Sequence, residues 1–153
     1  KEISVTLFSG FAYRYLSNES KNRTTTTGND GYDRHTHYYY SPIGASIAIN
    51  EQENWALKAT LEYDFFWFGR HESNLGYLAS YNDRTYEQNS GYGYRLSLAL
   101  QRKITSYSRI SIEPFFRLWD IEDSDRLMLT SESYAFEPAN KTSEFGLNIS
   151  LLF

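Results

Sequence analysis

Taken at alternate positions, most of the last eleven residues of the chain sort into two kinds of side chain. One set is apolar and partly aromatic: Phe145, Leu147, Ile149, Leu151 and Phe153. The other set is polar or small: Glu144, Gly146, Asn148 and Ser150. Because successive side chains of a β-strand point to opposite faces, this pattern predicts a two-faced strand over residues 143–153 that ends on an aromatic residue.

The same alternation predicts five further strands, over residues 2–16, 37–50, 55–70, 92–101 and 110–119. Long polar connections run through residues 24–28, 71–90 and 122–141, whereas residues 51–53 and 102–108 form short ones. Long and short connections therefore alternate along the chain. We expect an all-β fold, an antiparallel up-and-down transmembrane β-barrel with tight turns and both termini at one end and elaborated loops at the other.

Composition is compatible with this fold. No run approaches the roughly 20 apolar residues that a membrane-spanning helix needs, which excludes a helical membrane protein. The mean hydropathy of −0.59 is no objection, because only alternate residues of a barrel strand face lipid. Aromatic residues make up 18% of the chain, as expected where rings line membrane interfaces. The chain begins almost directly in a strand, so export would require a leader that has been removed or a trimmed chain.

Other functional classes find little support in the composition. Cysteine is absent, so disulfides and thiolate metal sites are excluded. The net charge of −4 argues against a nucleic-acid partner. No residue pattern indicates a cofactor.

Alternation alone does not tell which face lies inside, and a soluble lipocalin-like barrel is the main alternative. The apolar sets carry no charged residue, large rings cluster toward the strand ends, and the opposite face is rich in charge, which together favour lipid outside. Six strands are evident, whereas single-chain bacterial barrels start at about eight. We therefore expect eight or more strands in the complete barrel. Further strands would lie near residues 75–81 or 127–136, or else the single domain 1–153 would be the C-terminal part of a larger barrel. Pro114 predicts a bulge or local break in its strand.

The polar face carries five charges of each sign. One of these ten charges is Glu2. We expect the other nine to form a charge network in the lumen: Arg14, Lys58, Glu62, Asp64, Arg70, Arg95, Glu113, Arg117 and Glu144. Charges enclosed in a narrow barrel must be paired or hydrated, and a selective pore would favour a ring of one sign. The balance therefore predicts a plugged lumen, with a small diffusion pore as an alternative.

Histidines near the predicted long-loop end raise the question of catalysis. Asp33, His35 and His37 precede the second predicted strand and His71 follows the third, a position similar to the Asp and His rim groups of omptin proteases. No counterpart of the paired acidic residues accompanies them, and no third ligand accompanies His35 and His37 at a diagnostic metal spacing. A lipid A deacylase-like serine, such as Ser41 or Ser73, has little specificity among so many serines. Exposed loop histidines are the favoured interpretation, and a rim hydrolase is the alternative.

Several segments resemble small proteobacterial outer-membrane β-barrel, or porin-like, proteins. They are the terminal strand, the run Tyr38, Tyr39, Tyr40 with Pro42 and Gly44, the stretch Trp119, Asp120, Ile121, and Glu137, Pro138, Asn140 and Thr142. The resemblance implies location in the bacterial outer membrane, contact with its lipid and lipopolysaccharide, and a terminal signal for the barrel-assembly machinery, for which Phe153 is the matching residue. We therefore expect a non-enzymatic barrel whose three long extracellular loops bind a ligand or a surface.

Overall fold

The computed structural model describes residues 2–24, 26–51, 54–78 and 81–153, and all regular structure among them is β. Their bounds are β1 (Glu2–Ser9), β2 (Ala12–Asn18), β3 (Asp33–Glu51), β4 (Trp55–Asn74), β5 (Arg84–Gln88), β6 (Gly91–Lys103), β7 (Arg109–Ile121), β8 (Leu127–Met128), β9 (Tyr134–Ala135) and β10 (Asn140–Leu152). Within these ranges, no helix has the length and apolar character needed to cross a membrane.

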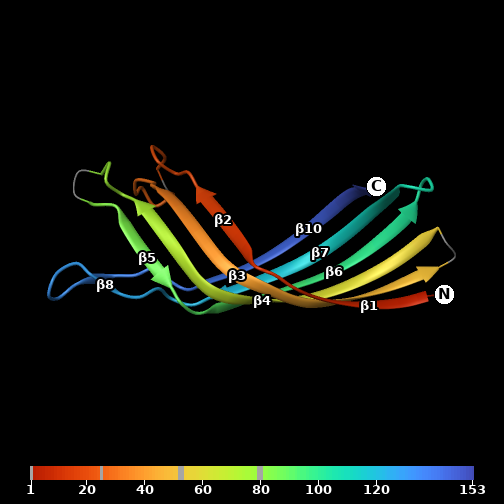
Figure 1. The fold of residues 1–153 in the computed structure, drawn as a ribbon. Coiled ribbons are helices and arrows are strands. Elements are labelled where there is room, and N and C mark those ends of the chain that lie inside the picture. Colours follow the sequence, from red (N-terminus) through yellow and green to blue (C-terminus); the bar gives the residue numbers. More distant parts are fainter. Residues whose placement is uncertain (1, 25, 52–53, 79–80) are drawn as a thin grey trace.

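One antiparallel sheet contains eight of these strands (Figure 1). Its main order is β1-β3-β4-β6-β7-β10, with β2 also pairing with β3 and β5 also pairing with β4. The all-β, antiparallel character predicted from the alternation is therefore confirmed. Closure is not observed, because β1 and β10 are the two edges of an open sheet and are not paired with each other.

Two predicted segments differ from the structure because strands break without leaving the sheet. The strand predicted over residues 2–16 is divided at Gly10 and Phe11 into β1 and β2, which both pair with β3. The amide of Gly10 donates to the carbonyl oxygen of Pro42 at 3.1 Å, so the break is a kink that retains contact with β3. Similarly, β5 and β6 pair with successive parts of β4. Part of the long connection predicted at residues 71–90 is thus a strand that extends the sheet.

The strand that contains Pro114 pairs incompletely with its neighbour. Pairing between β6 and β7 stops at Ser97–Phe115 and resumes at Leu100–Ile112, so the local break expected at Pro114 is confirmed.

The strands predicted within the long connections do not extend the main sheet. Residues 127–136 do contain two short strands, but β8 and β9 pair only with each other and add no strand to the main sheet. Of the segment 75–81, residues 79–80 lie outside the described part of the chain, and the rest contains no strand.

The sheet is strongly curved, and side chains meet across its concave face. The ring of Trp119 on β7 lies 4.9 Å from that of Tyr40 on β3, measured between centroids. These strands are three places apart in the sheet, which corresponds to about 14 Å if the sheet were flat. Arg14 on β2 and Glu144 on β10 form an ion pair across five places, about 24 Å in a flat sheet. Figure 1 shows the resulting bend, with both ends of the sheet raised.

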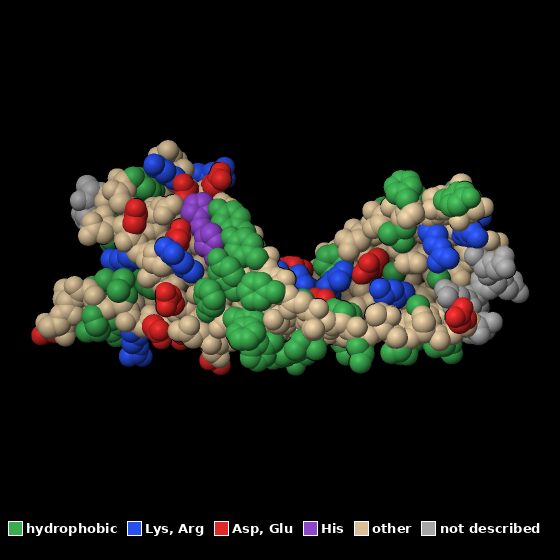
Figure 2. Space-filling model, viewed as in Figure 1, with side chains coloured by type: hydrophobic (Ala, Val, Ile, Leu, Met, Phe, Trp, Pro, Cys, Tyr) green, Lys and Arg blue, Asp and Glu red, His purple; other side chains and the backbone are tan. Residues whose placement is uncertain are grey.

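Strand register sorts the side chains into rows that cross the whole sheet. Two rows on the convex face are formed entirely by uncharged residues. One is Ile3, Ile49, Leu57, Leu100, Ile112 and Ile149. The other is Leu7, Ala45, Leu61, Leu96, Phe116 and Phe145. Most of these side chains are exposed, so the convex face presents an apolar surface. In Figure 2 this face is seen edge-on, with hydrophobic side chains along the lower border.

The concave face holds the compact core of the molecule. Its buried hydrophobic cluster is Tyr38, Tyr40, Phe66, Trp119 and Ile121. Trp119 is only 1% exposed although its strand lies near the edge of an open sheet. Burial of each large ring stabilises the fold by roughly 2–3 kcal/mol. The cluster therefore stabilises the curvature of the sheet in the half that carries the long connections.

Glycine is required where a ring on one strand crosses the next strand. A Cβ added at Gly44 would overlap the ring of Phe8 and lie 2.7 Å from the carbonyl oxygen of Leu61. Nothing comes nearer than 3.9 Å to a Cβ added at Gly10. We expect Gly44→Val to destabilise the fold by about 2 kcal/mol or more. Gly10→Ala should change stability little, and urea titration of refolded protein in detergent micelles compares the two variants. Equal stability of both would contradict the close packing at Gly44.

Candidate functional site

A row of charges crosses the concave face. Register places Glu62 opposite Arg95, Arg95 opposite Arg117, and Arg117 opposite Glu144, on β4, β6, β7 and β10 in turn. Each belongs to the polar half of an alternating strand, so the same periodicity that exposes the apolar rows brings these charges to the opposite face. In Figure 2 charged side chains gather in the hollow between the two raised ends.

Carboxylates on other strands hold the two central arginines, on the adjacent strand for Arg95 and two strands away for Arg117. Arg117 lies 2.8 Å from Glu62 and 3.4 Å from Asp64, whereas Arg95 lies 3.0 Å from Glu113. Asp64 is 0% exposed, so the guanidinium of Arg117 provides the charge compensation that this carboxylate cannot obtain from water. Glu62 and Asp64 thus share one arginine.

Trp119 joins the charge row to the aromatic core. The guanidinium groups of Arg14 and Arg117 lie 5.5 and 5.7 Å from its ring centroid, and both form ion pairs. An arginine with an aromatic face on one side and a carboxylate on another loses most of its conformational freedom. The row is therefore an ordered network that also stabilises the curvature.

Seven of the nine charges predicted to face the lumen make these contacts: Arg14, Glu62, Asp64, Arg95, Glu113, Arg117 and Glu144. Lys58 lies on the same face, in the row of Ala48 and Ala99, and has no ion pair within the described residues. Arg70 is not brought to this network, because it is exposed and pairs with Glu72 at 3.0 Å. Phe153 is 95% exposed and follows directly after β10.

A bulge in β4 explains the position of Arg70. Tyr40 pairs with Phe66, but the preceding residue, Tyr39, pairs with Phe68. Trp67 is the extra residue, so every later side chain of β4 faces the opposite way from strict alternation. Gly69, His71 and Ser73 consequently point to the buried side and Arg70 to the exposed side.

The three histidines are divided between the two faces of the sheet. His35 and His37 lie beside Tyr15 and Tyr13, whose hydroxyl groups are 2.7 and 2.6 Å from their Nδ1 atoms. His71 is buried at the concave side. No cluster of three His, Cys, Asp or Glu side chains suited to a metal occurs within the described ranges. Of the two serines considered for catalysis, Ser41 accepts a hydrogen bond from Trp67 and Ser73 is buried.

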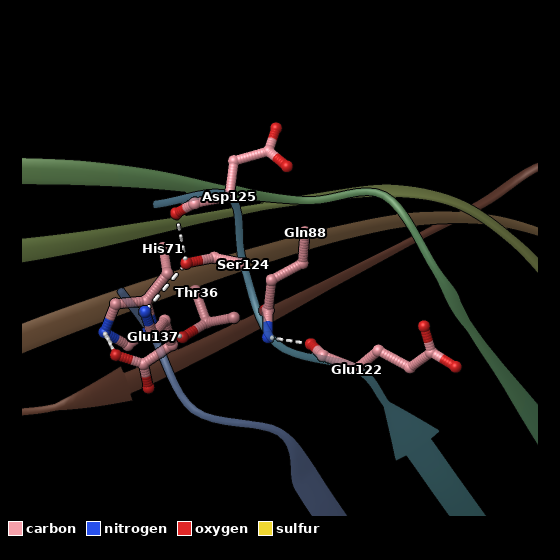
Figure 3. A network of polar contacts seen from close by, with 7 residues as sticks. All are labelled: Thr36, His71, Gln88, Glu122, Ser124, Asp125 and Glu137. Carbon is pink, nitrogen blue, oxygen red and sulfur yellow. Dashed lines mark hydrogen bonds and ion pairs between the residues drawn. The ribbon is translucent and has the colours of Figure 1, made fainter. Parts of the chain in front are cut away.

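A second polar site, not found by the sequence analysis, lies where the long connections meet the sheet (Figure 3). Oγ1 of Thr36 on β3 is 2.8 Å from Nδ1 of His71 on β4, and Nε2 of His71 is 3.3 Å from Oε2 of Glu137. Gln88 from β5 is 1% exposed, and its Nε2 donates to the carbonyl oxygen of Glu122 at 2.9 Å. These side chains come from three strands and the chain segments on both sides of β8 and β9.

Backbone hydrogen bonds fix the two segments that cover this site. The amide of Ser124 donates to the carbonyl oxygen of Glu137 at 2.9 Å, and the amide of Glu137 donates to Oγ of Ser124 at 2.7 Å. The amide of Asp125 donates to the carbonyl oxygen of Glu87 at 3.0 Å. The two segments adjoin a cavity of about 210 Å³, which we call the loop-side cavity. It is lined by Leu16, Ser17, Asn18, Arg34, Thr36, Tyr38, His71, Gln88, Glu137 and Asn140.

Burial controls the charges at this cavity. Loss of contact with water, assisted by the nearby positive charge of Arg34, lowers the pKa of His71 from 6.5 to about 4. Burial raises the pKa of Glu137, and Arg34 partly offsets that shift. His71 is therefore neutral near pH 7 and is able to act as a hydrogen-bonding group in the wall of the cavity.

Comparison with models of known protein families and with curated proteins finds no match to this chain. Functional inference therefore depends on the charge row, the apolar rows and the loop-side cavity.

Removal of Arg117 should leave two buried carboxylates without their cation. We expect Arg117→Leu to destabilise the protein by about 3–5 kcal/mol. The change is measured by urea titration in micelles, and the triple variant with Glu62→Gln and Asp64→Asn should recover part of the loss. Lys141→Ala is the control, because its ion pair with Asp120 is at the surface, and it should cause little change. Equal losses in the two single variants would contradict a buried charge network.

His71 should make stability depend on pH. Its pKa is about 4 in the folded protein and near 6.5 in the unfolded chain. Between these values only the unfolded chain binds the proton, so folding is destabilised progressively as the pH falls from 6.5 toward 4, by at most about 3 kcal/mol. Unfolding free energy should therefore fall more steeply with decreasing pH in the original protein than in His71→Gln. Parallel profiles would show that His71 is not buried in its neutral form.

Proposed function

We propose that the chain is an outer-membrane β-barrel protein in which a charge-paired interior holds the wall in shape and the long connections act outside the cell. The observation that carries this proposal is the set of uncharged rows that cross the six strands β1, β3, β4, β6, β7 and β10 on the convex face. On a protein surrounded by water, so large an exposed apolar surface would be an aggregation hazard. Contact of this surface with membrane hydrocarbon would remove the aggregation hazard.

The height of the apolar surface supports the same proposal. On β4 its exposed rings run from Trp55 to Trp67, twelve residues apart. At about 3.3 Å per residue and a tilt near 40°, this stretch spans about 30 Å, which covers an apolar band of about 25 Å and the aromatic rings at its two borders. Toward the Trp67 border lie Tyr63, Tyr92 and Tyr94, and at the other border Arg102 lies over the ring of Trp55. Aromatic and basic residues at these levels suit membrane–water interfaces.

A membrane location has a consequence for the sheet edges. Unpaired backbone groups of β1 and β10 would be costly in hydrocarbon, so these edges must be paired there. The two strands are antiparallel to each other by their places in the sheet, which allows them to pair directly or through an even number of additional strands. The second arrangement gives the eight or more strands typical of such proteins.

Paired charges support a plugged interior rather than a selective pore. Both central arginines face carboxylates, and no ring of one sign crosses the concave face in the described residues. The partners we propose are outer-membrane lipid and lipopolysaccharide at the convex face, the barrel-assembly machinery at Phe153, and a ligand at the loop end. The proposed role is binding at the cell surface.

Spin labels at single introduced cysteines test the proposed environment, and the absence of native cysteine keeps the labelling specific. Leu61→Cys and Leu98→Cys lie on the convex face, whereas Thr60→Cys and Ser97→Cys are neighbouring controls on the concave face. In bilayers, the convex labels should collide frequently with oxygen, which concentrates in lipid, and rarely with a water-soluble nickel reagent. The concave labels should lack this lipid signature. Convex labels that respond only to the nickel reagent would contradict the proposal, as would a protein that stays monomeric without detergent.

A further inference from the structure

Three features of the loop-side cavity point to a ligand. The first is Arg34, which lines the cavity and whose guanidinium lies 5.4 Å from the ring centroid of Tyr32. Within the described residues, its side chain has neither an ion pair nor a hydrogen bond. A cation that is held in place without a direct ion pair is suited to receive a carboxylate.

The second feature is the amide of Gln88. Its Nε2 is committed to the carbonyl oxygen of Glu122, which fixes the orientation of the amide because an oxygen in that place would face another oxygen. Oε1 is then directed away from Glu122 and has no partner, although the side chain is almost fully buried and lines the cavity. A buried acceptor left unpaired costs about 1–3 kcal/mol, so a ligand that donates a hydrogen bond here would be favoured.

The third feature is the carboxylate of Glu137, also in the cavity wall. It adds a second acceptor to the wall and, when ionised, a negative charge that disfavours sulfate or phosphate. The cavity thus combines one cation that has no direct ion pair with two acceptors, one of them anionic. Its volume of about 210 Å³ is smaller than the 300 Å³ or more of sites for drug-sized ligands.

We propose that the loop-side cavity binds a free amino acid as a zwitterion, with its carboxylate at Arg34 and its ammonium group at Gln88 Oε1 and Glu137. The charges of such a ligand complement those of the wall, and its size matches the cavity. Neutral His71 and Thr36 complete the wall without adding charge. This site is distinct from the charge row and does not depend on the membrane location, so it extends the proposed surface function to a specific small solute.

Binding is tested with the full chain refolded in detergent micelles, by saturation-transfer NMR against each of the twenty proteinogenic amino acids. The best binder is then compared with two analogues, the hydroxy acid in which the ammonium is replaced by hydroxyl and the amine that lacks the carboxylate. We expect at least one amino acid to bind, and each analogue to bind at least about tenfold more weakly, since each loses a charged hydrogen bond. Absence of binding by all twenty, or equal binding of the hydroxy acid, would overturn the proposal.

Variants locate the site. Arg34→Gln and Gln88→Leu should each weaken binding about tenfold or more, and Arg34→Lys should weaken it less because the charge is retained. Arg126→Gln is the matched control: Arg126 also stacks on a tyrosine, 4.5 Å from the ring centroid of Tyr134, but lies outside the cavity. Circular dichroism identifies any variant that fails to fold, and Arg34→Gln, on the border of the cavity, keeps the test valid if Gln88→Leu does not fold. Unchanged binding in folded Arg34→Gln would contradict the assignment.

Discussion

Contacts between side chains of distant strands determine the shape of this sheet. Trp119 packs on Tyr38 and Tyr40, and Arg14 pairs with Glu144, across strands that hydrogen bonding alone would keep well apart. These contacts require the sheet to curve. Curvature in turn separates a concave face, where charges neutralise one another, from a convex face on which only uncharged side chains remain over most of the strand length.

The strands themselves were predictable because each has one apolar and one polar side. Alternation such as that of Phe145 to Leu151 appears only if one face meets an apolar environment, and that preference is local enough to be seen in the sequence. It also placed Arg95 and Arg117 together on one face, since the register between β6 and β7 is the same on both sides of the break at Pro114.

Other features depend on information that no local pattern contains. The bulge at Trp67 reverses the faces of the later part of β4, and because alternation does not reveal a bulge, it placed Arg70 on the wrong side of the sheet. The loop-side cavity was missed for a similar reason. Gln88 and Glu137 belong to polar segments without periodicity, and only the fold brings them to His71. A polar segment after Ile121 gives no sign that Ser124 will bind back to residue 137.

The central claim is that side chains draw the two borders of the sheet together across the concave face. It is tested most directly by cross-linking Arg14→Cys/Glu144→Cys with a short bis-maleimide in refolded protein, using Thr60→Cys/Ser97→Cys, which are directly opposed on the adjacent strands β4 and β6, as the control pair. The account predicts rapid cross-linking within one molecule for both pairs. Cross-linking of the control alone, as in a flat sheet with about 24 Å between β2 and β10, would contradict it.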